Sequence, residues 1–152
     1  MKPLLAAAAF VGLLGSQSGA PSALADAAGG AAAPSAPSAP FVPLPPFIDH
    51  TAWTQWGGGL TSLRVFPTPS GRAAAREPGT AASADEAWAE VLALSPGADT
   101  AGMRAQFICH WQFAEVAQPG KASWNLEPWR PVVDDAEMVA SGCNPGGPEE
   151  GF

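Results

Sequence analysis

Residues 51–66 read TAWTQWGGGLTSLRVF, and this stretch decides the fold that the sequence predicts. Threonine, tryptophan, leucine, valine and phenylalanine lie on both sides of three consecutive glycines, which is the composition of two β-strands joined by a turn. In the second half, Leu63 and Val65 lie on one face, and Arg64 and Phe66 lie on the other. We therefore predict an antiparallel hairpin with a glycine loop and a bulge, ended by the prolines that follow.

The next segment, residues 70–82 (SGRAAAREPGTAA), is predicted to be a mobile loop. A helix is expected after it, because Ser83 and Glu86 have the spacing of a capping box. Three apolar side chains then follow at helical spacing, and Pro-Gly ends the helix. They are Trp88, Val91 and Leu92.

A second helix is expected to start at Asp99 or Thr100 and to carry Met103, Phe107 and Trp111 on one stripe. Cys109 and His110 would then lie in its last turns or just beyond them.

A third, short helix is predicted over residues 135–141. Asp134 is its candidate N-cap, with Glu137 three positions later, and Gly142 suits a left-handed C-terminal cap. A hairpin followed by two to three short helices predicts a small α+β single domain over residues 47–147.

The amino end has the pattern of a secretory signal peptide. Lys2 precedes an uncharged apolar run, and Ala23 and Ala25 are the small residues before a predicted cleavage after Ala25. The run is shorter than the ~20 residues that span a bilayer, so we expect a secreted protein without a membrane span in the mature chain. Residues 26–46, rich in Ala, Pro and Ser, are predicted to form a disordered tether, and residues 148–152 a flexible tail.

Cys109 and Cys143 are the only cysteines. An exported chain meets an oxidising environment, so we predict a disulfide between them. The alternatives are two free thiols or a nucleophilic pair of Cys109 with His110.

The sequence also resembles a known family. GMRAQFICHWQF, KASWNLEPWRPVV and ASGCNP occur in the order seen in the domain of unknown function 2599 family, which consists of small exported bacterial proteins. The resemblance covers residues 48–145 and extends to the hairpin. It implies an exported, disulfide-bearing domain and carries over no catalytic residue.

The formal net charge is −7, and it becomes −8 when removal of the signal peptide takes away Lys2. An acidic chain without a cluster of basic residues argues against binding to nucleic acid or to an anionic membrane. We expect a monomer without a cofactor.

Several side chains are weak candidates for acid–base chemistry, and no known catalytic motif joins them. They are His110 with Glu127 or Asp134, His50 beside Asp49, Asp135, and Ser123 as a hydroxyl for His110. For His110, a hydrogen bond from its ring to a backbone carbonyl near the disulfide is the favoured interpretation. Asp134 and Asp135 are interpreted as a helix start and His50 as a surface residue. The scattered positions give no support for a metal site.

The segment WNLEPWRP, residues 124–131, is stiffened by its two prolines. Trp124 and Leu126 would alternate into the core of a strand. Because the segment is not helical, Glu127 and Arg130 need not face each other. We therefore expect Arg130 to form a bidentate pair with a carboxylate from elsewhere and to stack on a tryptophan.

Six tryptophans and no tyrosine suggest a binding function. Trp53, Trp56 and Trp129, each near a turn or a proline, are the predicted exposed rings for stacking on polysaccharide, with Arg130 beside them. A non-catalytic extracellular or envelope-associated interaction domain is the first interpretation. A small hydrolase-like enzyme and a secreted inhibitor or effector are the alternatives.

Overall fold

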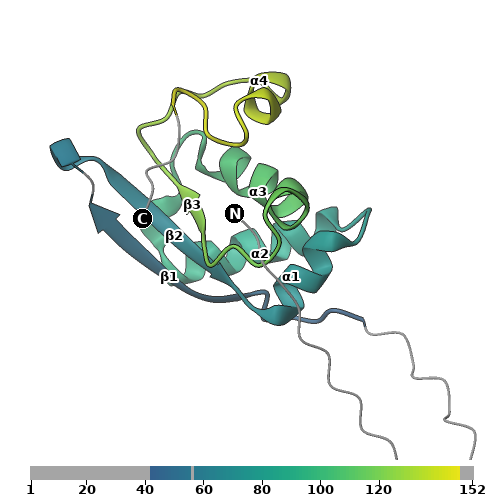
Figure 1. Cartoon of the computed structure of the whole chain (residues 1–152). Helices are drawn as coiled ribbons and strands as arrows, with labels where there is room; N and C mark the ends of the chain where they lie inside the picture. The colour runs from purple at the N-terminus through teal and green to yellow at the C-terminus, as the bar shows by residue number, and fades with distance from the viewer. Residues whose placement is uncertain (1–41, 56, 148–152) are drawn as a thin grey trace, which may run out of the picture. The chain divides into compact units, whose positions relative to one another are not determined.

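The computed structural model describes residues 42–55 and 57–147 of the chain (Figure 1). The predicted signal peptide, most of the predicted tether, Trp56 and the predicted tail lie outside the described residues. At the end of the predicted tether, the Leu44 amide donates a hydrogen bond to Ser70 Oγ, and Thr68 Oγ1 donates one to the Pro46 carbonyl. Contacts within the domain therefore begin by Leu44.

The predicted hairpin is confirmed. Strand β1 (Ile48–Gln55) pairs antiparallel with β2 (Thr61–Pro67), and β2 pairs antiparallel with β3 (Trp124–Leu126), so that β2 is central. The short 3-10 turn η1 (Gly57–Gly59) joins β1 to β2, and two of its glycines have a φ of 80°. The register shift lies near the start of β1 and not at the glycine loop.

Four α-helices and a second 3-10 turn complete the domain, which confirms the α+β class. They are α1 (Pro69–Arg76), α2 (Ala81–Leu94), η2 (Pro96–Ala98), α3 (Met103–Ala117) and α4 (Asp135–Ala140). Helices α1, α2 and α3 contact the sheet, and α4 packs on α3 (Figure 1). No helix within the described residues has the length and apolar character needed to cross a bilayer.

Helix α1 corrects the prediction of a mobile loop over residues 70–82. Thr68 caps the helix by accepting a hydrogen bond from the Gly71 amide at 2.9 Å, and Pro69 occupies the first turn, where a missing N–H costs nothing. A β-carbon on Gly71 would meet the Phe47 carbonyl oxygen at 2.2 Å. The glycine that suggested a loop is therefore a point of close contact between α1 and the segment that enters β1.

The predicted starts of the next two helices are wrong by a few residues. Helix α2 begins at Ala81, before the proposed cap Ser83, and the Thr80 hydroxyl that precedes it accepts a hydrogen bond from the Trp111 indole. Helix α3 begins at Met103, after Gly102, whose φ of 83° ends the preceding turn. In both cases a tertiary contact or a glycine conformation, and not the local cap, sets the boundary.

Helix α4 and the disulfide are confirmed. Asp134 caps α4 by accepting a hydrogen bond from the Glu137 amide at 2.9 Å. Gly142 has a φ of 61°, so the chain turns back after the helix. Cys109 and Cys143 form a disulfide across 34 positions of sequence, which joins α3 to the segment after α4. Because α3 runs on to Ala117, Cys109 lies in its middle and not near its end.

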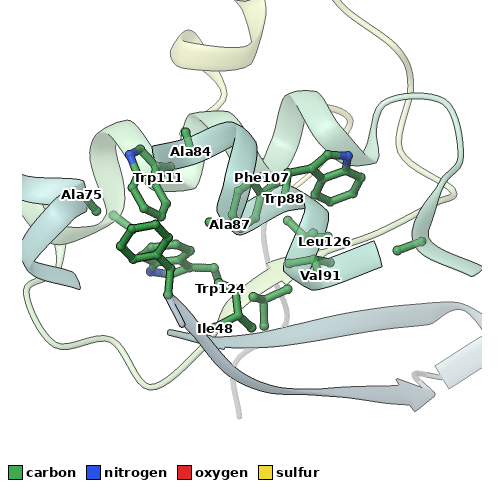
Figure 2. Close-up of a cluster of buried hydrophobic side chains, with 14 of the residues drawn as sticks. Ile48, Ala75, Ala84, Ala87, Trp88, Val91, Phe107, Trp111, Trp124 and Leu126 are labelled. Atoms are coloured by element: carbon green, nitrogen blue, oxygen red, sulfur yellow. The ribbon is translucent and has the colours of Figure 1, made fainter. Parts of the chain in front are cut away.

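The core lies between the sheet and helices α1 to α3 (Figure 2). Leu63 and Val65 of β2 and Trp124 and Leu126 of β3 are fully buried, as their alternation predicts. The predicted stripe on α3 is also buried, and its aromatic rings pack with those of neighbouring elements at centroid distances of 5.4 to 6.2 Å. This cluster consists of Phe47, Trp88, Phe107, Trp111 and Trp124. All five rings are buried and structural, and none of them is among the tryptophans proposed for binding.

Two carboxylates on helices hold the periphery of the core. Glu90 accepts hydrogen bonds from the backbone amides of Phe47 and Ile48 at 2.8 and 2.7 Å, so α2 fastens the start of β1. Glu115 on α3 is buried and forms ion pairs with Arg72 and Arg76, which fastens α1.

Candidate functional site

The turn that follows β3 brings Glu127 and Arg130 together. The Arg130 amide donates to the Glu127 carbonyl at 3.2 Å, with Pro128 in the second position of the turn. Arg130 Nε then lies 2.6 Å from Glu127 Oε2, and both side chains are fully buried. The expectation that the carboxylate comes from elsewhere is therefore wrong, because a tight turn, and not a helix, makes residues three apart face each other.

This ion pair is the centre of a buried polar network. Ser62 Oγ donates to the second carboxylate oxygen of Glu127 at 2.8 Å. The Gln106 side chain pairs with the backbone of Glu127 by two hydrogen bonds of 2.9 and 3.0 Å. Arg130 Nη1 donates to the carbonyls of Pro145 and Gly147 at 3.2 and 2.7 Å. The network therefore joins β2, α3, the turn after β3 and the C-terminal segment.

Arg130 also stacks on a tryptophan, as predicted. Its Cζ atom lies 4.7 Å from the centre of the Trp129 ring. The Trp129 indole donates to the Thr61 carbonyl at 3.0 Å, so the ring is fixed at the hairpin end of the sheet and is partly buried. Arg130 itself is buried, so it can affect the surface only by holding the Trp129 ring in position.

His110 lies in the middle of α3 with its side chain turned toward β3. Its Nε2 donates to the Asn125 carbonyl at 3.0 Å, which confirms the favoured interpretation of a ring bonded to backbone. Burial lowers the pKa of His110 to about 4, and the positive charges of Lys121 and Arg130 act in the same direction. The ring is therefore neutral at physiological pH.

The predicted acid–base partners of His110 have other hydrogen bonds. The Glu127 carboxylate accepts from Ser62 and pairs with Arg130. Asp134 caps α4 on the surface. Ser123 Oγ donates to the side-chain oxygen of Asn125 at 2.8 Å. The fold thus places these groups in structural contacts and does not join them to the imidazole.

His50 is exposed, as predicted, and its Nδ1 lies 2.7 Å from Asp49 Oδ2. Its ring stacks on Phe66 with a centroid distance of 4.1 Å. Over residues 42–55 and 57–147, no three His, Cys, Asp or Glu side chains are grouped so as to hold a metal ion.

Of the predicted exposed tryptophans, Trp53 has 43% of its surface exposed. Trp53 pairs with Leu63 in the sheet. Two positions further along β1, Gln55 pairs with Thr61, whose carbonyl accepts the hydrogen bond from Trp129. Leu60, beside η1, is also exposed. We call this region, formed by Trp53, Leu60 and Trp129, the hairpin end.

Three clefts in the described part of the chain were not foreseen from the sequence. One of about 550 Å³ lies between α3 and the connection from α1 to α2, and a more open one of about 440 Å³ lies between the segment that enters β1 and the end of α2. A third, of about 360 Å³, lies beside the disulfide, and we call it the cystine cleft. It is lined by His110, Phe113, Ala114, Ala117, Gln118, Lys121, Val139, Gly142, Cys143 and Asn144. Phe113 and Val139 lie outside the apolar stripes that predict the buried faces of their helices. This spacing was the one signal in the sequence for an exposed apolar surface there.

Comparison with known proteins matches the sequence to a family of unknown function and to uncharacterized mycobacterial proteins. The family model described as "Protein of unknown function (DUF2599)" matches residues 48–146. The uncharacterized protein Rv0477 of Mycobacterium tuberculosis is 62% identical over 154 residues, with 100% of both chains covered, and the uncharacterized protein Mb0487 of Mycobacterium bovis has the same values. The uncharacterized protein ML2452 of Mycobacterium leprae is 60% identical over 100 residues, which are 66% of this chain and 80% of that protein. No solved structure matches the chain.

Proposed function

The chain belongs to the DUF2599 family, and on that premise we propose that it is an exported, non-catalytic binding domain whose hairpin end contacts an extracellular polysaccharide. The proposal has three parts, namely export, binding without catalysis, and a tryptophan surface. Each part is supported by different residues.

Export is supported by the amino-terminal pattern and by the disulfide. The charged start, the apolar run and the small residues at Ala23 and Ala25 are typical of a cleaved signal peptide. The Cys109–Cys143 bond is the kind of covalent link that persists in oxidising compartments and stabilises small domains.

The placement of the acid–base groups is the observation that carries a binding function over a catalytic one. General-base catalysis requires a titrating group that reaches a nucleophile or a water molecule. The imidazole of His110 is only 4% exposed and is bonded to backbone, and the Glu127 carboxylate is neutralised by Arg130. Both groups therefore serve the stability of the domain.

The hairpin end supports recognition of sugar rings. Trp53 is the only exposed tryptophan within the described residues, with 43% of its surface exposed, and Leu60 lies near the same end of the hairpin with 39% exposed. An indole presents a large, rigid apolar face at low entropic cost, which suits stacking on a flat apolar partner. Trp129, held by Thr61 and Arg130, supplies a second fixed ring at this end.

The test is a titration of the intrinsic tryptophan emission with soluble cell-wall and plant polysaccharides. We expect one class of polymer to shift or quench the emission, and we expect Trp53→Ala to abolish this response with an unchanged melting curve. Leu94→Ala, a change at a side chain 50% exposed on α2, is the matched control and should bind as the parent protein does. If no polymer alters the emission and acrylamide does not quench Trp53, the proposal is wrong.

A further inference from the structure

The helices leave part of the sheet uncovered at the hairpin end (Figure 1). Thr51 Oγ1 lies 2.9 Å from Ser95 Oγ at the end of α2, so the helical layer reaches this point of β1. Further along the same face of β1, the side chains of Trp53 and Gln55 are exposed. Thr61, which pairs with Gln55 on β2, is partly exposed. We call the surface formed by Trp53, Gln55 and Thr61 the Trp53 surface.

The Trp53 surface places polar groups at the edge of a flat apolar ring. Side chains two positions apart on one strand are about 7 Å apart, and cross-strand partners have β-carbons about 5 Å apart. The Gln55 amide is therefore the next side chain along the strand from the Trp53 indole, and the Thr61 hydroxyl lies beside that amide. A ring that stacks on the indole can reach both polar groups through its own substituents.

The fold leaves the hydrogen-bonding groups of these side chains unused. Within residues 42–55 and 57–147, the Gln55 amide, the Thr61 hydroxyl and the Trp53 indole N–H form no hydrogen bond. A glutamine amide has two donors and an acceptor in one plane, and a hydroxyl both donates and accepts. Two adjacent hydroxyl groups of a sugar offer the complementary set of donors and acceptors.

The hairpin residues that carry this surface are all uncharged. No residue from Thr51 to Leu63 is acidic or basic. A charged group of a ligand loses hydration on binding, and an opposite charge is needed to compensate for that loss. The net charge of −7 also repels a polyanion. The composition of the hairpin therefore favours an uncharged ligand.

We propose that the Trp53 surface binds one unit of a neutral polysaccharide, with the sugar ring on the indole and two adjacent hydroxyl groups on the Gln55 amide. The Thr61 hydroxyl binds a further oxygen of the same unit. This inference rests on the proposed function and names its class of ligand, which is an uncharged polymer and not a polymer of uronic acids or amino sugars. Gln55 is then the residue that determines specificity.

The probes are two series of soluble polymers in which the sugar backbone is kept and the charge is changed. One series is dextran with its carboxymethyl and diethylaminoethyl forms, and the other is hydroxyethyl cellulose with carboxymethyl cellulose and quaternised hydroxyethyl cellulose. Each is titrated against the full chain by tryptophan emission. We expect the neutral form of at least one backbone to bind and its charged forms to bind about tenfold more weakly. The affinity for the neutral form should stay constant from about 0.01 to about 1 M salt.

Gln55 allows a matched pair of variants. Gln55→Ala should weaken the neutral polymer about five- to tenfold, because the ligand hydroxyls lose their partner. Gln112→Ala removes another exposed glutamine, on α3, and should bind as the parent protein does. Gln55→Glu keeps the shape of the side chain but replaces its donors with a negative charge. It should weaken the neutral polymer by a similar factor and strengthen the binding of the cationic forms. All three positions of change are exposed, so the melting curves should be unchanged.

The outcomes separate this inference from the proposed function. Equal or tighter binding of a charged form, or an affinity that falls with salt, would overturn the neutral class and leave polysaccharide binding in place. Equal affinities of Gln55→Ala and Gln112→Ala would remove Gln55 from the site. If no form of either backbone alters the emission, the inference is wrong. The proposed function is lost with it only when the wider titration of polysaccharides is also negative.

Discussion

Arg130 Nε lies 2.6 Å from Glu127 Oε2, and neither side chain has any exposed surface. Two charges buried in this way lose their hydration, and their attraction repays that loss only when further hydrogen bonds satisfy them. Ser62 supplies such a bond to Glu127, and the carbonyls of Pro145 and Gly147 supply them to Arg130. The pair therefore links the sheet to the C-terminal segment, and its loss should be felt by the whole domain.

Arg130→Met removes the cation and keeps most of the side-chain volume. We expect it to lower the free energy of unfolding by about 3 to 5 kcal/mol, because the Glu127 carboxylate is left buried without its partner. Urea unfolding followed by tryptophan fluorescence measures this change.

The double variant Glu127→Gln with Arg130→Met is the control for that prediction. The amide still accepts the hydrogen bond from Ser62 but carries no charge, so the double variant should be more stable than Arg130→Met alone. Arg104→Met, which breaks an exposed pair with Asp85, should cost less than about 1 kcal/mol. Equal losses in the Arg130 and Arg104 variants would contradict a stabilising role for the buried pair.

Reduction of the Cys109–Cys143 bond should destabilise the domain by roughly 3 to 4 kcal/mol, because the closed loop of 34 positions restricts the unfolded chain. The measurement is denaturant unfolding with and without a reducing agent. In the variant with both cysteines changed to serine, the reducing agent should have no effect. Two titratable thiols in protein collected from outside the cell would contradict the covalent link.

The burial of His110 predicts an acid-sensitive stability. The pKa of the imidazole is about 4 in the folded state and about 6.5 when unfolded, so in this interval the unfolded chain binds the extra proton. Stability is then fully present above about pH 6.5 and falls by about 3 kcal/mol as the pH drops to about 4.

Urea midpoints across this interval measure the effect of His110. His110→Gln keeps a donor for the Asn125 carbonyl and does not titrate, so its stability should change less with pH over the same range. A parallel pH dependence in the two proteins would show that other groups are responsible.

Gly71→Ala should destabilise the domain although alanine is the better helix former. The added methyl group would lie 2.2 Å from the Phe47 carbonyl oxygen, and relief of this overlap must separate α1 from the entry to β1. We expect a loss of about 1 to 3 kcal/mol. A gain in stability would mean that α1 does not pack there. Ala73→Gly, two positions along α1, is the propensity control and should cost about 1 kcal/mol.

The parts of the fold that were predicted correctly depend on neighbours in sequence. The alternation of Leu63 and Val65 predicts the buried face of β2, and the spacing of Met103, Phe107 and Trp111 predicts the buried stripe of α3. Asp134 predicts the start of α4, because a cap needs only the amide three residues on. Helix α1 was missed because Gly71 and the Pro78–Gly79 pair suggest a loop, and the close contact of Gly71 with Phe47 exists only in the tertiary structure.

The candidate sites were harder to predict. Trp53 was correctly expected to be exposed, but the cystine cleft depends on α3 and α4 lying side by side, which the disulfide and the packing of Met138 bring about. Nothing in the spacing of Phe113 and Val139 indicates that they face one space.

The amino-acid sequence by itself determined the hairpin, the helical stripes and the partners of the disulfide, since two cysteines allow one pairing within a chain. Only the tertiary structure decided which groups the charged and titratable side chains contact. Glu127 meets a serine 65 positions away, and His110 meets a carbonyl 15 positions away. Periodicity and caps act over one or two turns of chain, whereas the burial that neutralises a histidine or pairs a carboxylate exists only once distant segments have excluded water together.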